Sequence, residues 1–97
     1  MPLYITLLRW TDEGIRNVKD SPSRLEKAKE AIRASGGDFK AFYMTLGQYD
    51  AVTIGESPDD ATYAKTLLAI GSSGAVKTET LRAFSEQEYR EIIGSLG

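Results

Sequence analysis

Two absences limit the side chains that could carry chemistry in this sequence. Its 97 residues include no histidine and no cysteine. A Ser-His-Asp triad, a cysteine nucleophile, a thiolate cluster and a His-ligated zinc site are therefore excluded. Acid–base work falls to carboxylates and phenols, and the acidic residues are too scattered to predict an all-oxygen metal cage. We expect neither a metal nor a cofactor, and the sequence does not decide whether the protein is an enzyme.

The first candidate pair is Tyr49 and Asp50, which follow a turn at Gly47-Gln48. Adjacent residues of a strand point to opposite faces of the sheet, so if Tyr49 faces outward, Asp50 points towards the helices. Asp50 is then a candidate general acid or base, and Tyr49 a candidate hydrogen-bond donor. The alternative is that Asp50 accepts hydrogen bonds from backbone N–H groups or pairs with a nearby Arg or Lys.

Two aromatic residues are candidates for the walls of a ligand pocket. Trp10 ends the first predicted strand, where the chain enters its longest predicted loop, and its indole offers a flat apolar surface. Tyr43 places a phenol beside Thr45 in the second predicted strand. The alternative for both is structural: Trp10 would pack over a barrel rim or a partner subunit, and Tyr43 would lie in a dimer core.

A basic group could hold an anionic part of a ligand. Arg16, Lys19 and Arg24 lie close to Ser21, where a predicted helix begins and leaves N–H groups free. Acidic residues are interspersed in the same segment, so the alternative is a solvated loop with balanced charges.

Alternating strands and helices must position these residues. The predicted strands are Leu3–Trp10, Phe39–Leu46, Tyr49–Gly55 and Ala75–Phe84, and the segment Thr11–Asp20 is expected to be a loop. The predicted helices begin at Ser21-Pro22, at Ser57-Pro58 and at the capping box Ser85–Glu88. This order predicts an α+β, ferredoxin-like β-α-β-β-α-β fold with a C-terminal helix and an antiparallel four-stranded sheet, in a single domain over residues 1–97.

Period-2 alternation divides the strands into two faces. The face expected under the helices is apolar and contains Leu3, Ile5, Leu7, Phe42, Met44, Leu46, Val52 and Ile54. The opposite set is rich in tyrosine and threonine and contains Tyr4, Thr6, Leu8, Trp10, Phe39, Ala41, Tyr43, Thr45, Tyr49, Ala51 and Thr53. Because no helix covers that second set, we expect it to be filled by another copy of the chain. The fourth strand does not divide cleanly.

The helices show their own apolar stripes. The inner face of the second helix is predicted from Ala64, Leu67, Leu68 and Gly71, and that of the C-terminal helix from Tyr89, Ile92, Ile93 and Leu96.

Charge and hydropathy exclude two classes of partner. Twelve basic residues against fourteen acidic ones give a formal charge of −2, which does not favour a nucleic-acid surface. The apolar run Leu3–Leu8 is too short to span a bilayer and lacks the flanks of a signal peptide. We therefore expect a cytoplasmic protein that forms a homodimer or a higher homo-oligomer.

Several segments together resemble the GYD domain family. They are Leu8–Arg16, Lys19–Pro22 with Arg24, Phe42–Asp50, Ser57–Asp60 and Thr80–Phe84. The chain departs from the name-giving motif, because Gln48 separates Gly47 from Tyr49-Asp50. The resemblance implies a subunit of the dimeric α+β barrel type and implies no established reaction.

Two functional hypotheses follow. In the first, a homodimer binds a small organic molecule between its sheet and helices, with Trp10 and Tyr43 as walls, Tyr49 as donor and Asp50 as the acid or base of a cofactor-independent reaction. In the second, the protein is a non-catalytic assembly or regulatory module whose sheet face is filled by the partner subunit.

Overall fold

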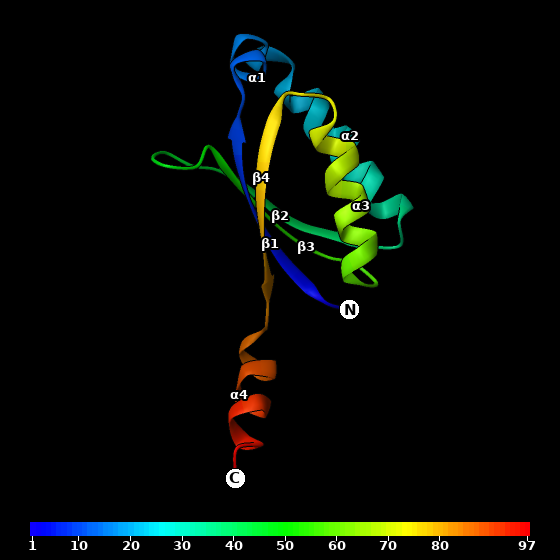
Figure 1. Cartoon of the computed structure of the whole chain (residues 1–97), viewed down its shortest axis with the longest axis vertical. Helices are drawn as coiled ribbons and strands as arrows, with labels where there is room; N and C mark the ends of the chain where they lie inside the picture. The colour runs from blue at the N-terminus through cyan, green and yellow to red at the C-terminus, as the bar shows by residue number, and fades with distance from the viewer.

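Four antiparallel strands form the frame of the molecule (Figure 1). A computed structural model describes all residues 1–97, and its strands are β1 (Leu3–Trp10), β2 (Asp38–Met44), β3 (Ala51–Glu56) and β4 (Val76–Ala83). Their order in the sheet is β2-β3-β1-β4, so the first strand lies in the interior and the hairpin partners β2 and β3 are neighbours. The predicted ferredoxin-like arrangement is confirmed.

Two helices, α2 (Ser21–Ala34) and α3 (Asp60–Gly71), cover one face of this sheet (Figure 1). None of the helices is both long and apolar enough to cross a membrane. The start of α3 differs from the prediction: Asp59 accepts a hydrogen bond from the Thr62 N–H and caps the helix, which therefore begins three residues after Ser57.

The expected assignment of the two sheet faces is wrong for β1 and β3. Tyr4 and Thr6 are buried beneath the helices, whereas the apolar residues that alternate with them, such as Ile5, point to the uncovered side. The cause lies in α3, whose buried residues are Tyr63 and Thr66. Its inner face therefore carries hydroxyl groups, and it is complementary to the Tyr/Thr side of the sheet rather than to the apolar side.

The inner stripe of α3 is displaced by one residue from the predicted one. Tyr63 and Thr66 are buried, while Leu68 is 75% exposed and Ala64 is exposed as well. Leu67 packs against the buried cluster, as expected.

Strand β2 contains an irregularity between Phe39 and Ala41, where its pairing with β3 shifts register. A β-bulge of this kind changes the side on which the following residues emerge. Phe39 and Phe42, three residues apart, consequently both line the space under the helices, together with Met44. Leu46, by contrast, lies in the loop after β2 and is 95% exposed, contrary to expectation.

The predicted loop Thr11–Asp20 is largely helical. It contains a short helix α1 (Asp12–Arg16) and a 3₁₀ turn η1 (Val18–Asp20). Thr11 caps α1 by accepting a hydrogen bond from the Gly14 N–H. Gly14 is required there, because a β-carbon at this position would lie 1.9 Å from the Ala75 carbonyl oxygen.

The C-terminal helix α4 (Glu86–Gly94) begins with the predicted capping box of Ser85 and Glu88. It projects from the end of β4, away from α2 and α3, and extends the molecule to 53 Å along its longest axis (Figure 1). The prediction that its apolar residues point inward is wrong, since Tyr89, Ile92, Ile93 and Leu96 are all exposed. Within one chain, the direction of β4 leaves no surface against which they could pack.

The buried hydrophobic cluster of the interior contains an aromatic pair between sheet and helix. The rings of Tyr4 and Tyr63 are stacked, with centroids 4.2 Å apart, and Ile32 completes the buried cluster. Burial, together with the hydrogen bond that its hydroxyl donates to Asp60, raises the pKa of Tyr4 to about 12. This phenol therefore stays protonated at neutral pH and keeps donating to the first turn of α3.

Candidate functional site

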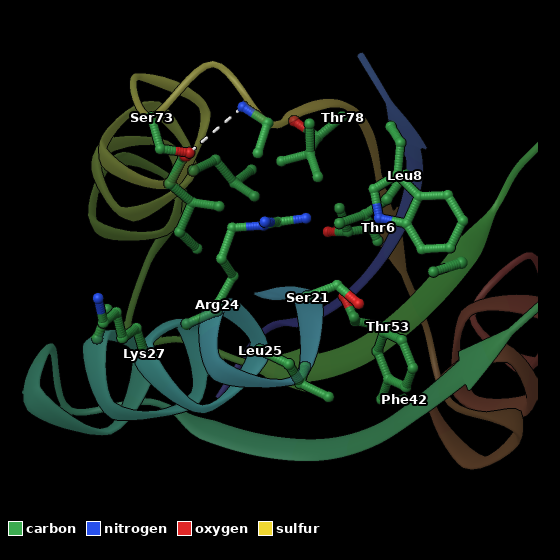
Figure 2. A pocket seen from close by; sticks show the side chains of 18 of the residues that line it. Thr6, Leu8, Ser21, Arg24, Leu25, Lys27, Phe42, Thr53, Ser73 and Thr78 are labelled. Atoms are coloured by element: carbon green, nitrogen blue, oxygen red, sulfur yellow. Dashed lines mark hydrogen bonds between the residues drawn. The ribbon is translucent and has the colours of Figure 1, made fainter. Parts of the chain in front are cut away.

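The main hollow of the molecule lies between the helix layer and the sheet (Figure 2). This cavity has a volume of about 700 Å³, and 17 of its 26 lining residues are hydrophobic. Leu8 and Trp10 of β1, Phe42 of β2, Leu25 of α2 and Leu67 of α3 are among them. The sheet and both covering helices thus contribute apolar side chains.

The space exists because the elements around it present short side chains to each other. Ala28 and Ala31 face it from α2, and Thr6, Ala51 and Thr53 form its floor. Interiors are normally packed to the density of organic crystals, and small residues on both sides prevent that here.

A chain of three hydroxyl groups begins at the lining of the cavity and continues behind it. The hydroxyls of Thr6 and Tyr63 are 2.8 Å apart, and the Thr6 and Thr80 hydroxyls are 3.0 Å apart. Thr6 and Tyr63 also line the cavity. Tyr63 was not among the residues predicted from the sequence, although a tyrosine on the inner face of an amphipathic helix is a signal that could have identified it.

Three charged residues line the cavity: Arg24, Lys27 and Asp50. Arg24 extends from α2 into the hollow (Figure 2), where its guanidinium donates to the carbonyl oxygens of Asn17 at 3.1 Å and Gly14 at 3.4 Å. It therefore reaches the cavity, as the prediction of an anion-binding arginine requires.

Asp50 accepts a hydrogen bond from a backbone N–H group, which is the alternative to a catalytic role. Its Oδ2 accepts a hydrogen bond of 2.9 Å from the backbone N–H of Trp10, and its own N–H donates to the carbonyl of Leu8. The carboxylate thus fastens the end of β1 at the edge of the cavity. A role for it as general acid or base stays a prediction.

The other predicted site residues lie elsewhere. Tyr43 is 59% exposed and does not line this cavity, so its role at a ligand stays a prediction. Arg16 and Lys19 are exposed and do not line the cavity either. Of the three predicted cations, only Arg24 therefore lines the cavity. The other two lie in α1 and η1.

Tyr49 belongs to a polar cluster that does not line the cavity. Its hydroxyl donates to Glu79 Oε2 at 2.6 Å, and the guanidinium of Arg9 lies 4.8 Å from its ring centre. The hydrogen bond to Glu79 is the main cause of a raised pKa of Tyr49. The side chains of Tyr49 and Asp50 therefore contact different groups, and the structure does not bring them together at one site.

Comparison with known proteins identifies the family. A family model described as the GYD domain matches residues 4–93. The chain belongs to the GYD domain family. This agrees with the resemblance seen in the sequence.

One curated relative of this GYD domain is the "Glutamine synthetase and cystathionine beta-lyase binding protein" of Thermus thermophilus. The two are 38% identical over 84 residues, which cover 86% of this chain and 88% of the relative. A solved protein structure from Thermus thermophilus is similar, with a TM-score of 0.56, 25% identity and coverage of 88% and 95% of the two chains.

A second solved structure, the leucine response regulatory protein of Mycobacterium tuberculosis, has a TM-score of 0.65 at 17% identity. The alignment covers 87% of this GYD domain and 51% of that chain, so the present chain spans about half of the regulator's length. At this identity the likeness concerns the fold alone.

In this GYD domain, the loop that contains Gly47 and Asp50 holds the β2–β3 hairpin against β1. Gly47 has a φ of +110°, a conformation that side chains rarely adopt, and it permits the reversal after β2. The Thr45 hydroxyl donates to the Tyr49 carbonyl at 2.6 Å, and the Thr45 N–H donates to the Asp50 carbonyl at 2.9 Å. The residue inserted at Gln48 is accommodated in this loop, and Asp50 still reaches β1.

Proposed function

We propose that this GYD domain is a homodimeric small-molecule-binding protein whose site is the cavity between the helix layer and the sheet. The cavity carries the proposal, because its volume of about 700 Å³ lies within the range of roughly 300–1,000 Å³ that ligand pockets occupy. Its predominantly apolar lining with a few polar groups is also typical of such pockets. A void of this size loses packing contacts, and a bound ligand would restore them.

Filling the cavity should abolish binding. The replacement Ala31→Phe places a ring inside the hollow, since Ala31 lines it from α2. For the natural chain, a metabolite present at about 100 times its Kd should add about 2.7 kcal/mol and raise the melting temperature by roughly 10–20 °C. In the variant this rise should disappear. The measurement is a thermal-shift screen of small metabolites, with Trp10 fluorescence as a second signal from the cavity wall.

The matched control is Ala34→Phe, because Ala34 lies on the same helix but is exposed and does not line the cavity. This control should respond to the same metabolites as the natural chain. If no metabolite changes either signal in the natural chain, the binding proposal fails.

The proposed second copy packs on the uncovered face of the sheet. We define this outer face by Leu3, Ile5, Leu7, Val52, Ile54 and Leu81. Ile5 pairs with Ile54 on one side and with Leu81 on the other, so the apolar side chains are contiguous across three strands. A continuous apolar face of this kind is typical of an interface, and pairing of identical faces through a two-fold axis is the commonest way to bury one.

A second candidate function is that of a regulatory module that binds metabolic enzymes. Two observations favour it: the name of the 38% identical relative, and the apolar side chains that α4 exposes to solvent. The test measures, by biolayer interferometry, whether the chain binds purified glutamine synthetase or purified cystathionine β-lyase. Ile92→Glu on α4 should weaken binding about tenfold or more, whereas Glu91→Gln should not. If neither enzyme binds the natural chain, this candidate is removed.

A further inference from the structure

Arg24 is a cation without a carboxylate partner in the chain. Its two hydrogen bonds go to backbone carbonyls, and none of the ion pairs of the structure includes it. The side chain is partly buried and lies beside Leu25 and the other apolar residues of the cavity. A charge that is partly removed from water is costly unless a counter-charge or further hydrogen bonds compensate it.

The guanidinium retains donors for a ligand. It carries five N–H groups, and the carbonyls of Asn17 and Gly14 use two of them, so three remain. Those two bonds also hold the guanidinium in one orientation, which reduces the entropy lost when a ligand binds. A planar fork of this type matches the two oxygens of a carboxylate.

The charge balance of the lining also favours an anion. Arg24 and Lys27 supply two positive charges, and Asp50 supplies one negative charge, so the sum is +1. One oxygen of Asp50 is already bonded to the Trp10 N–H. The surplus of one charge suits a monoanion better than a doubly charged phosphate ester.

The other residues that line the cavity indicate the chemical character of the rest of the ligand. Beyond Arg24 the cavity presents Phe39, Phe42, Leu67 and Ile70, with the threonines of the floor. We propose that the cavity binds an amphipathic carboxylate, that is, a molecule with one carboxylate held by Arg24 and an apolar aliphatic or aromatic body among these side chains. This inference rests on the proposed function of the cavity and specifies its ligand class.

The test compares matched acids and alcohols. Octanoate with octanol, and phenylbutyrate with phenylbutanol, are titrated into the full chain by isothermal calorimetry. At least one acid should bind about tenfold or more tightly than its alcohol, because hydrogen bonds to a charged group are stronger than those to a neutral one. In Arg24→Gln the acid should lose this preference while the alcohol keeps its affinity. Arg24→Lys, which keeps the charge, should retain part of the preference.

Arg33→Gln is the matched control, because Arg33 lies on the same helix but is exposed and does not line the cavity. It should bind the acids as the natural chain does. If acid and alcohol bind the natural chain equally, the cavity is a binding site but the carboxylate inference is wrong. If none of the four compounds binds, the carboxylate inference is wrong as well, and the proposed function fails with it only when the thermal-shift screen of metabolites is also negative. Both outcomes are read on the natural chain, so they do not depend on the folding of a variant.

Discussion

Replacing Ile5 by aspartate is expected to separate the proposed dimer into single chains. Ile5 lies at the centre of the outer face, with Ile54 and Leu81 on the neighbouring strands. A carboxylate there would be removed from water without a partner, at a cost of about 3–5 kcal/mol. That cost corresponds to a dimer Kd weakened at least about 100-fold, since 1.4 kcal/mol is a factor of ten. Two-fold symmetry places a second aspartate in the same interface.

Size-exclusion chromatography with light scattering measures this effect. The natural chain should elute with twice the mass of 10.7 kDa, and Ile5→Asp with a single chain's mass. Ile15→Asp is the matched control, because Ile15 lies in α1, beyond the end of the sheet, and is already 50% exposed (Figure 1). The outer-face dimer is disproved if the natural chain is monomeric at micromolar concentration, or if Ile5→Asp remains a dimer with intact sheet circular dichroism.

The second large effect is expected from Tyr63→Ala, which should lower the free energy of unfolding by about 3–5 kcal/mol. Tyr63 is only 3% exposed, stacks on Tyr4 and shares a hydrogen bond with Thr6. Its removal eliminates the stacked contact with Tyr4 and enlarges an existing hollow. The loss is a large part of the roughly 5–15 kcal/mol that usually stabilises a domain.

Urea unfolding followed by circular dichroism provides the measurement. Tyr63→Phe should cost only about 1 kcal/mol, because it removes the hydroxyl and keeps the stacked ring. Tyr89→Ala, at a tyrosine that is 58% exposed on α4, should change the free energy of unfolding by no more than about 0.5 kcal/mol. A loss below about 1 kcal/mol for Tyr63→Ala would contradict the assigned core.

The element order and the capping box at Ser85 could be predicted because they depend on local residue patterns. Which side of the sheet faces the helices could not. Alternation shows that Tyr4 and Ile5 point to opposite sides, but the choice between the sides depends on what α3 presents from about 60 residues further along the chain. Hydropathy alone assigns the more apolar side to the interior, and that side is in fact the one left uncovered.

Some residues of the candidate site could also be predicted from the sequence, but its size could not. Trp10, Arg24 and Asp50 were identified from their types and local surroundings, and all three line the cavity. The cavity itself was predicted only as a location between sheet and helices. Its size follows from alanines on α2 meeting threonines of the sheet, and a pattern within one element does not reveal how far apart two elements lie. The bulge in β2 turns both Phe39 and Phe42 inward. It also could not be predicted from one element, because it arises in the pairing of β2 with β3.

Two threonines that line the cavity determine how easily the polarity of the proposed site can change. Thr53 and Thr78 face the hollow, and their hydroxyls form no side-chain hydrogen bond with the rest of the chain (Figure 2). Valine has nearly the same shape as threonine, with a methyl group in place of the hydroxyl. A single exchange at either position would therefore alter the polarity of the floor while the strands keep their places. The ligand preference of the proposed site can in this way be changed by a single substitution, without any change in the fold that supports it.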